Sequence, residues 1–525
     1  MPHNHSPRLA RLFTCLFFFL CQFIPSRPAA LAEPPGGADL PAPAMLKDIN
    51  ATPYPSTPGG LYPLDGLVYF AADGLAGREV WRSDGTPGGT FQVSDINPGP
   101  GGSVEGALHD ADFFGSLDGT LFFPADDGSG AGVELWRTDG TDAGTSLVKD
   151  IHPGGDSRPD GFLSAGGLLF FVADDGGGQA LWRSDGTPGG TFSSGVLATA
   201  YARNTTMAAY GGLVYFRGCD PARGCELWRW NGLPGQAEIV AEINPTGDAN
   251  PDHLRVVGDT LYFAADDGVH GVELWKASPA GVELVRDIVE GSGSSSPANL
   301  AGLNGQVFFA ATTPAQGTEL WRSNGSAGGT ALVADLNPGE ASGLNAYDPM
   351  LAMGGVLYFL GGDSLTGFEL CKTDGTAVSL VKDINPGTYG SGISAITALD
   401  GVLYFSAKDL PASYISLSNY ELWRSDGTPA GTYQVKDIRP GEGSAFNANP
   451  IVAAGGKLFF GAADRPSGWD LWVSDGSAAG TTRLPVNPMT AGAAIGLVIP
   501  LGERLFFGAD DGLHGVEPWI SDGTP

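Results

Sequence analysis

Basic residues are scarce in this sequence. Only 28 of its 525 residues are Lys or Arg, against 58 Asp and Glu, and the formal net charge is −30. A surface of that charge repels nucleic acid and anionic lipid, which argues against both as partners, and it attracts cations or basic proteins. The alternative is that the acidic surface only keeps a large protein soluble.

Long apolar runs are also missing, apart from one at the N-terminus. Leu12 to Ile24 is shorter than the ~20 residues that span a bilayer, and no later segment approaches that length. Arg8 and Arg11 precede this run and Ala30-Leu31-Ala32 follows it, which gives the three parts of a secretory signal peptide. We predict that residues 1–32 are a signal peptide cleaved after Ala32. The mature protein is then secreted, extracellular or periplasmic, without a transmembrane segment.

Familiar catalytic motifs are absent as well. The sequence contains no Gly-x-Ser-x-Gly elbow, no Gly-x-x-x-x-Gly-Lys phosphate loop and no His-Glu-x-x-His pair. Paired acids for glycoside cleavage stay open, because acidic residues are abundant and their separation in space is invisible in the sequence. We therefore predict no catalytic residue and favour a non-enzymatic protein.

One motif is present many times. Its clearest copy, Glu421 to Thr432, reads Glu-Leu-Trp-Arg-Ser-Asp-Gly-Thr-Pro-Ala-Gly-Thr. The tryptophan of this motif recurs at Trp81, Trp136, Trp182, Trp228, Trp275, Trp321, Trp423, Trp472 and Trp519, and Cys371 takes its place in one further copy. The ten copies are 46 to 55 residues apart. A period of this length is typical of stacked or radial repeats, whose units cannot bury their apolar surface alone.

Each repeat contains four short apolar runs separated by turn sequences. A two-residue turn of Gly, Asn or Asp, such as Gly455-Gly456, joins the first run to the second, because tight hairpins need φ > 0 there. The third run carries the tryptophan, and Ser-Asp-Gly-Thr leads into the fourth. Four strands of about five residues with their turns make one propeller blade. We predict an all-β β-propeller of four-stranded blades.

The two ends of the chain complement each other. Met45 to Asn50 resembles the fourth run of a repeat, with no first three runs before it, whereas the last repeat stops at Pro525 without a fourth run. We predict that residues 45–525 form a ring of ten blades closed by this N-terminal strand. Because propellers usually have four to eight blades, two smaller propellers are the alternative. Residues 33–44, rich in Pro, Gly and Ala, are a predicted flexible leader.

Acidic loops between the second and third runs form the predicted binding face, together with the connections between repeats. Carboxylates suit Ca²⁺, which is the candidate cofactor, although no Asp-x-Asp-x-Asp-Gly with a distal Glu occurs. Two of these loops also contain a histidine at the same position, so the candidate metal ligands are Asp266, Asp267, His270, Asp510, Asp511 and His514. The alternative is that all six are solvated turn residues.

The tryptophans and the acid two residues before each of them have structural interpretations. We expect the indole rings to pack between blades and the acids to accept hydrogen bonds, with a ring of acids facing a channel as the alternative. Cys219 and Cys225 flank one loop and are predicted to form a disulfide, as an exported protein permits. Cys371 is expected to be a buried thiol.

The unit Glu-Leu-Trp-x-x-Asp-Gly-Thr at Glu421 to Thr428 resembles the ELWxxDGT repeat of exported bacterial proteins. The resemblance extends over essentially all of residues 45–525 and implies a propeller-like secreted or surface protein, with no general activity to carry over. Our first hypothesis is a monomeric, non-enzymatic binding or scaffold module that presents its acidic loop face to an extracellular protein or polysaccharide. The alternative is an extracellular glycan-acting hydrolase or lyase whose carboxylates meet near the axis.

Overall fold

The described part of the chain is all-β. The computed structural model describes residues 43–49, 55–104, 113–198, 206–409, 419–440, 445–446, 450–465, 468–484 and 493–524. These residues form strands β1 to β40 and the 3-10 turn η2 (Ala327–Gly329), and the same residues contain no α-helix. The predicted signal peptide (1–32) and nearly all of the predicted leader lie outside the described residues.

By compactness the chain divides into two units. The first comprises Met1–Gly74, Ser83–Phe91 and Val381–Pro525, and the second comprises Leu75–Arg82 and Gln92–Leu380.

Four antiparallel strands, consecutive in the sequence, make up the recurring sheet. The strands of the first four sets are β2 (Gly59–Leu64), β3 (Leu67–Gly74), β4 (Gly77–Ser83), β5 (Phe91–Gln92); β6 (Gly115–Leu117), β7 (Thr120–Ala125), β8 (Glu134–Thr138), β9 (Ser146–Lys149); β10 (Asp160–Ala165), β11 (Leu168–Asp174), β12 (Gln179–Ser184), β13 (Phe192–Leu197); β14 (Met207–Tyr210), β15 (Leu213–Asp220), β16 (Gly224–Trp230) and β17 (Glu238–Ala241). The strands of the next three sets are β18 (Asp252–Val257), β19 (Thr260–Asp266), β20 (Val272–Ser278), β21 (Gly281–Arg286); β22 (Ala298–Leu303), β23 (Gln306–Thr313), β24 (Gly317–Ser323), β25 (Ala331–Ala334); β26 (Leu351–Met353), β27 (Val356–Asp363), β28 (Gly367–Thr373) and β29 (Val378–Lys382). The last strands are β30 (Ser394–Leu399), β31 (Val402–Ala407), β32 (Glu421–Ser425), β33 (Tyr433–Lys436); β34 (Val452–Ala454), β35 (Lys457–Arg465), β36 (Gly468–Ser474), β37 (Thr482–Arg483); β38 (Val498–Leu501), β39 (Arg504–Asp510), β40 (Val516–Ser521) and β1 (Ala44–Met45).

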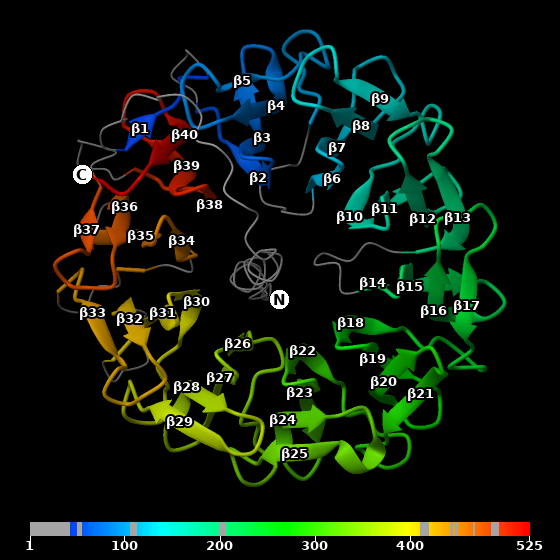
Figure 1. The fold of residues 1–525 in the computed structure, drawn as a ribbon, viewed down its shortest axis with the longest axis vertical. Helices are drawn as coiled ribbons and strands as arrows, with labels where there is room; N and C mark the ends of the chain where they lie inside the picture. Colours follow the sequence, from blue (N-terminus) through cyan, green and yellow to red (C-terminus); the bar gives the residue numbers. More distant parts are fainter. Residues whose placement is uncertain are drawn as a thin grey trace, which may run out of the picture. The chain divides into compact units, whose positions relative to one another are not determined.

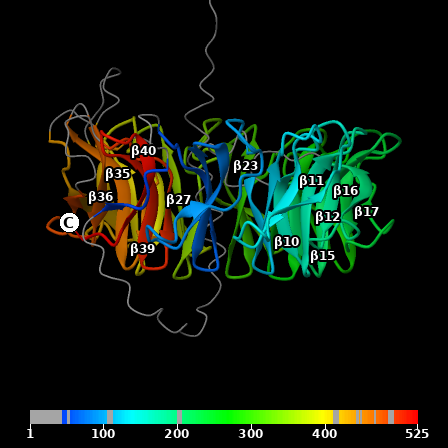
Figure 2. The ribbon, with the colours of Figure 1, turned by 90° about the horizontal axis from the view of Figure 1, so that it is seen from above.

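The four-strand set recurs ten times. Strands β10 to β17 are joined into one eight-stranded sheet by a single pairing, Leu197 with Cys219, so that sheet contains two sets. Figure 1 shows the strands of each set in sequence order, and Figure 2 shows β10, β11 and β12 from the side as neighbouring strands. The prediction of an all-β, propeller-like protein of repeated four-stranded sheets is confirmed at this level.

The last sheet takes its fourth strand from the N-terminal segment. Strand β1 pairs antiparallel with β40, giving the order β1-β40-β39-β38 within the first unit (Figure 1). The Leu46 N–H also donates to the Pro518 carbonyl at 2.8 Å, and the Ile49 N–H donates to Glu517 Oε2 at 2.9 Å. The predicted partner of this segment is therefore found, although the order of one sheet does not by itself close a ring.

The turn after the tryptophan strand explains the repeated Ser-Asp-Gly-Thr-x-x-Gly-Thr. In Ser184 to Thr191 the two hydroxyls at the ends are 2.7 Å apart, and Asp185 Oδ1 accepts from the Thr187 N–H at 2.9 Å and the Thr187 hydroxyl at 2.7 Å. A Cβ at position 190 would overlap the Asp185 carboxylate, which is why glycine stands there. The sequence repeats because the turn needs each of these side chains.

Tryptophans of the motif pack against the preceding set along the chain, as is seen for Trp182, Trp321, Trp472 and Trp519. Trp81, Trp182, Trp321, Trp423, Trp472 and Trp519 are buried, and Trp136, Trp228 and Trp275 are half-buried. Lys436 Nζ lies 5.7 Å from the ring centre of Trp472 and donates to the Thr481 carbonyl at 2.6 Å. Lys149 makes the same pair of contacts with Trp182 and Thr191. Each set thus gains a polar tie as well as apolar area from its neighbour.

Candidate binding pocket in the fourth repeat

The fourth repeat departs from the common turn. Trp230-Asn231-Gly232-Leu233 stands where other repeats have Ser-Asp-Gly-Thr. Trp230 is fully buried, its ring centre is 5.6 Å from that of Phe170 and 6.0 Å from that of Phe192, and its Nε1–H donates to the Leu233 carbonyl at 2.7 Å. The turn therefore folds over an indole ring instead of closing on an aspartate.

Two side-chain amides close this turn. Asn231 Nδ2 donates to Gln236 Oε1 at 2.7 Å, and Asn231 Oδ1 accepts from the Leu233 N–H at 2.9 Å. The Gln236 N–H donates to the Leu233 carbonyl at 3.2 Å. The turn consequently presents amides at its surface, where most other repeats present a carboxylate.

A row of polar side chains crosses the sheet below the turn. Tyr215 of β15 is paired with Arg229 of β16, and Arg229 is paired with Glu238 of β17, so the three side chains lie on one face. Arg229 Nε is 2.8 Å and Arg229 Nη2 is 2.6 Å from Glu238 Oε1. Hydrogen bonds raise the pKa of Arg229, the one to Glu238 most and the one to Tyr215 second. The guanidinium is held in place and charged.

The fifth repeat offers Arg229 no turn carbonyl of the kind that its equivalents in other repeats reach. The equivalent Arg137 and Lys276 reach the next repeat, donating to the carbonyls of Gly186 at 2.7 Å and Gly325 at 2.5 Å, both in Ser-Asp-Gly-Thr-type turns. The fifth repeat lacks that turn, since Ser278 and Gly281 pair across a two-residue hairpin. Lys276 also pairs with Glu283 of its own sheet, at 2.7 Å, so Arg229 keeps the equivalent cross-strand pair with Glu238 and lacks only the contact with a turn carbonyl. The altered turn of the fourth repeat and the two-residue hairpin of the fifth repeat thus lie together at this site.

A pocket of about 370 Å³ lies at this end of the fourth sheet. It is lined by Leu213, Arg229, Trp230, Asn231, Gly235, Gln236, Ala237 and Glu238, all within the second unit. Its volume falls in the range of roughly 300–1,000 Å³ that small-molecule sites have. Among the described residues, Glu238 Oε2 and Gln236 Nε2 make no hydrogen bond, and the Glu238 side chain is 59% exposed. The pocket offers an acceptor and a donor beside the apolar side chains of Leu213, Trp230 and Ala237.

The predicted metal ligands serve as turn caps in the structure. His270 Nδ1 is 2.7 Å from Asp267 Oδ2, His514 Nδ1 is 2.7 Å from Asp511 Oδ2, and these contacts raise the pKa of both histidines. Asp266 and Asp510 accept the N–H groups of Gly268 and Gly512. Across the described ranges, no three His, Cys, Asp or Glu side chains converge as a metal site would require. The calcium and metal assignments stay predictions.

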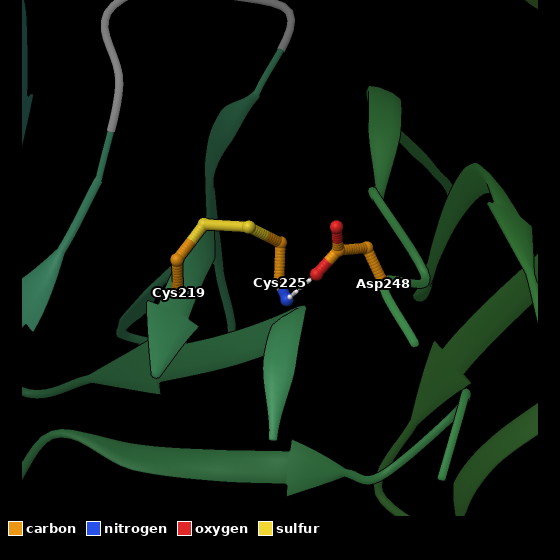
Figure 3. Close-up of a disulfide and its surroundings, with 3 residues drawn as sticks. All are labelled: Cys219, Cys225 and Asp248. Atoms are coloured by element: carbon orange, nitrogen blue, oxygen red, sulfur yellow. Dashed lines mark hydrogen bonds between the residues drawn. A yellow bond between two sulfur atoms is a disulfide. The ribbon is translucent and has the colours of Figure 1, made fainter. Parts of the chain in front are cut away.

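The predicted disulfide is present at the opposite end of the same sheet. Cys219 of β15 and Cys225 of β16 are bonded, and the Cys225 N–H donates to Asp248 Oδ1 at 2.8 Å (Figure 3). Cys371, which replaces the repeat tryptophan, is a buried thiol whose pKa is raised to about 12 by burial. It is therefore a packing residue and a poor nucleophile.

The pocket lies on the side of the strands that was not predicted to bind. Leu213 follows the turn between the first two strands of its set, and residues 231–236 join the last two, whereas the acidic loops join β15 to β16 and their equivalents. The sequence does carry a signal for the pocket, since Ser-Asp-Gly-Thr is lost in the fourth and fifth repeats in succession.

Repeated four-stranded antiparallel sheets with a polar pocket at one turn place this chain in the class of propeller-like repeat proteins. No family model matches the sequence, and the search of curated proteins finds no relative. Among solved structures, the chain is similar to a puromycin-hydrolysing peptidase of Mycobacterium tuberculosis, at 14% identity and a TM-score of 0.31, over 72% of this chain and 63% of that one. It is also similar to a puromycin hydrolase (17% identity, TM-score 0.28, 76% and 58% covered) and to prolyl endopeptidases (10% identity, TM-score 0.33, 67% and 54% covered).

These comparisons correct the first functional hypothesis. The hypothesis of a non-enzymatic binding or scaffold module with an acidic loop face is not supported by these structures, which are those of hydrolases. This chain spans about 60% of the length of those proteins, and at such identities their activities and substrates do not transfer to it. A helix of membrane-spanning length and hydropathy is not found in the described part of the chain.

Proposed function

We propose that the fourth repeat recognises a neutral saccharide in its pocket. The observation that carries this proposal is the pairing of Arg229 with Glu238 next to the pairing of Asn231 with Gln236, which leaves Glu238 Oε2 and Gln236 Nε2 open to a ligand. A sugar hydroxyl both donates and accepts hydrogen bonds, so neighbouring hydroxyls fit a carboxylate acceptor beside an amide donor. Because the guanidinium and the carboxylate cancel in charge, the pocket favours a neutral ligand over an anionic one.

The proposal assigns recognition to this pocket and no bond cleavage. Most glycosidases use two carboxylates that flank the scissile bond. Among the residues that line the pocket, Glu238 is the one carboxylate, and its Oε1 is already bonded to Arg229. The pocket therefore supplies specificity for a hydroxylated ligand without an acid and base pair.

Titration calorimetry with neutral and acidic monosaccharides and disaccharides tests the proposal. We expect Glu238→Gln to weaken neutral-sugar binding by about tenfold, because a hydrogen bond to a charged group contributes ~1.5–3 kcal/mol. The matched control is Glu283→Gln, which removes the equivalent cross-strand pair, Lys276 Nζ to Glu283 Oε1 at 2.7 Å, in the fifth repeat. Binding that is equal in the two variants, or no binding of any neutral sugar, contradicts the proposal.

We also propose that the ten sets close into one ring and that the protein is exported. Support for closure comes from the first unit, where β1 completes the last sheet and the rings of Phe70 and Phe506, from the first and last repeats, lie 5.2 Å apart. Support for export comes from the signal-peptide features of residues 1–32 and from the Cys219–Cys225 disulfide.

A further inference from the structure

Tyr210 lies beside the pocket on the same face of the fourth sheet. Strand β14 pairs with β15 so that Tyr210 is directly opposite Leu213, an apolar side chain of the pocket. Residues directly opposite each other in antiparallel strands project to one face, with Cβ atoms about 5 Å apart. The Tyr210 ring is thus the next side chain beyond the pocket wall.

The ring of Tyr210 is held in one orientation. Its hydroxyl donates to the Asp259 carbonyl at 2.7 Å, in the turn between β18 and β19 of the following repeat. Its ring centre is 5.6 Å from that of Tyr215, and burial raises the pKa of Tyr210. The side chain remains half-buried, so part of it is open to solvent. A ring tied at its tip and packed on one side loses little further entropy when a ligand lies on it.

An aromatic residue at this position occurs in the fourth repeat alone. The position is the last residue of the first strand, opposite the first residue of the second strand. In the other nine repeats it is occupied by Leu64, Leu117, Ala165, Val257, Leu303, Met353, Leu399, Ala454 and Leu501. The fold therefore accepts an aliphatic side chain here. The one aromatic ring coincides with the one repeat that combines the altered turn and the Arg229–Glu238 pair.

From this coincidence we infer that the ligand is an oligosaccharide, with one sugar in the pocket and the next on the Tyr210 ring. The inference rests on the proposed function and extends it from a saccharide to a chain of at least two rings. One face of a pyranose carries C–H groups that pack on an aromatic ring, whereas its hydroxyls point to the sides. The chain would leave the pocket across Leu213 and run toward the turn that contains Asp259.

Chain-length dependence of binding tests this inference. The probes are glucose, cellobiose and cellotriose, with the matching mannose and galactose series, and the variants are Tyr210→Leu and Tyr210→Phe. In the unaltered protein, we expect the disaccharide of the preferred series to bind about tenfold more tightly than its monosaccharide. Tyr210→Leu, which introduces the side chain found in five other repeats, is expected to abolish that gain without changing monosaccharide affinity. Tyr210→Phe keeps the ring and should keep most of the gain.

The outcomes separate this inference from the proposed function. Suppose that a monosaccharide binds and that its affinity depends on Glu238. If the disaccharide then binds no more tightly, or if Tyr210→Leu keeps the higher affinity for the disaccharide, the second subsite is wrong and the proposed function of the pocket is retained. If no saccharide of any length binds, both are wrong. A melting temperature of Tyr210→Leu equal to that of the unaltered protein shows that a change in affinity does not reflect unfolding.

Discussion

At the scale of single residues, the acid of the Glu-Leu-Trp motif is a buried carboxyl group with a raised pKa. Glu421 is completely buried and accepts the N–H groups of Ile438 at 2.7 Å and Arg439 at 3.2 Å, which ties the connection after the fourth strand to the third. Burial raises the pKa of Glu421 to about 8, and raises those of Glu79, Glu319 and Glu517 to about 7. The accepted hydrogen bonds favour the ionised form, but they offset only part of the free energy that burying the charge costs.

These raised pKa values predict a protein that is more stable at pH 5.5 than at pH 8. A folded pKa above the unfolded value near 4.5 means that the folded state binds more protons in between. The stabilisation is fully present below pH 4.5 and is lost as the pH rises through 7 to 8. Melting temperatures measured by calorimetry at pH 5.5 and pH 8 check this prediction, and a higher melting temperature at pH 8 would contradict it. In the Glu421→Gln variant the side chain is neutral at both pH values, so the difference between the two melting temperatures should be smaller.

At the scale of elements, the last sheet depends on a strand from the far end of the sequence. Strand β1 covers the edge of β40, and Leu46, which follows β1, is buried. An uncovered edge presents unpaired N–H and C=O groups and invites pairing with other chains. The two-residue strand is short, but its continuation to Ile49 adds the contact with Glu517.

Removing this segment should expose the edge of β40. A chain that begins at Ala51 is expected to melt at a lower temperature and to aggregate more readily than one that begins at Glu33. A synthetic peptide of residues 42–50, added in trans, should restore much of the loss by re-forming the pairing. The same peptide with Leu46→Asp is the control, since a charge cannot occupy that buried position. Equal melting of the two chains would contradict the role assigned to β1.

At the scale of the whole molecule, the repeat is held by contacts between consecutive sets. Basic side chains of one set donate to backbone carbonyls of the next, as Lys382 does to Thr432 and Arg286 to Thr330. Such nearest-neighbour ties stabilise an array of any length, so they do not choose between one ring and two. The choice rests on the two ends, where Arg504 of the last repeat donates to the Gly85 carbonyl of the first at 3.1 Å.

Electron microscopy of single particles tests the closed ring. We expect face-on class averages to show one disc with ten radial densities. Two smaller discs, or an open arc with a gap between the first and last repeats, would contradict closure.

Much of the fold was predictable because it follows from local chemistry. Gly455-Gly456 favours φ > 0 wherever it stands, Asp185 caps its own turn, and alternating apolar runs form strands in any context. Even the pairing of β1 with β40 follows from counting, because one fourth strand is missing at one end and one is left over at the other. The pocket was missed because it depends on a neighbour. The loss of Ser-Asp-Gly-Thr from the fifth repeat is visible in the sequence, but the residues around Arg229 do not show that this turn supplies the carbonyl that Arg137 and Lys276 use.

The sequence by itself determined the ten repeats, their four strands, the turn residues and the Cys219–Cys225 bond, since each depends on residues close together in the chain or on a simple count. Only the tertiary structure decided that Arg229 turns to Glu238, that Tyr210 stands next to Leu213, and that His270 pairs with Asp267 in a turn. Those contacts depend on the register between paired strands and on the groups that the neighbouring repeat presents. A sequence pattern shows neither of these.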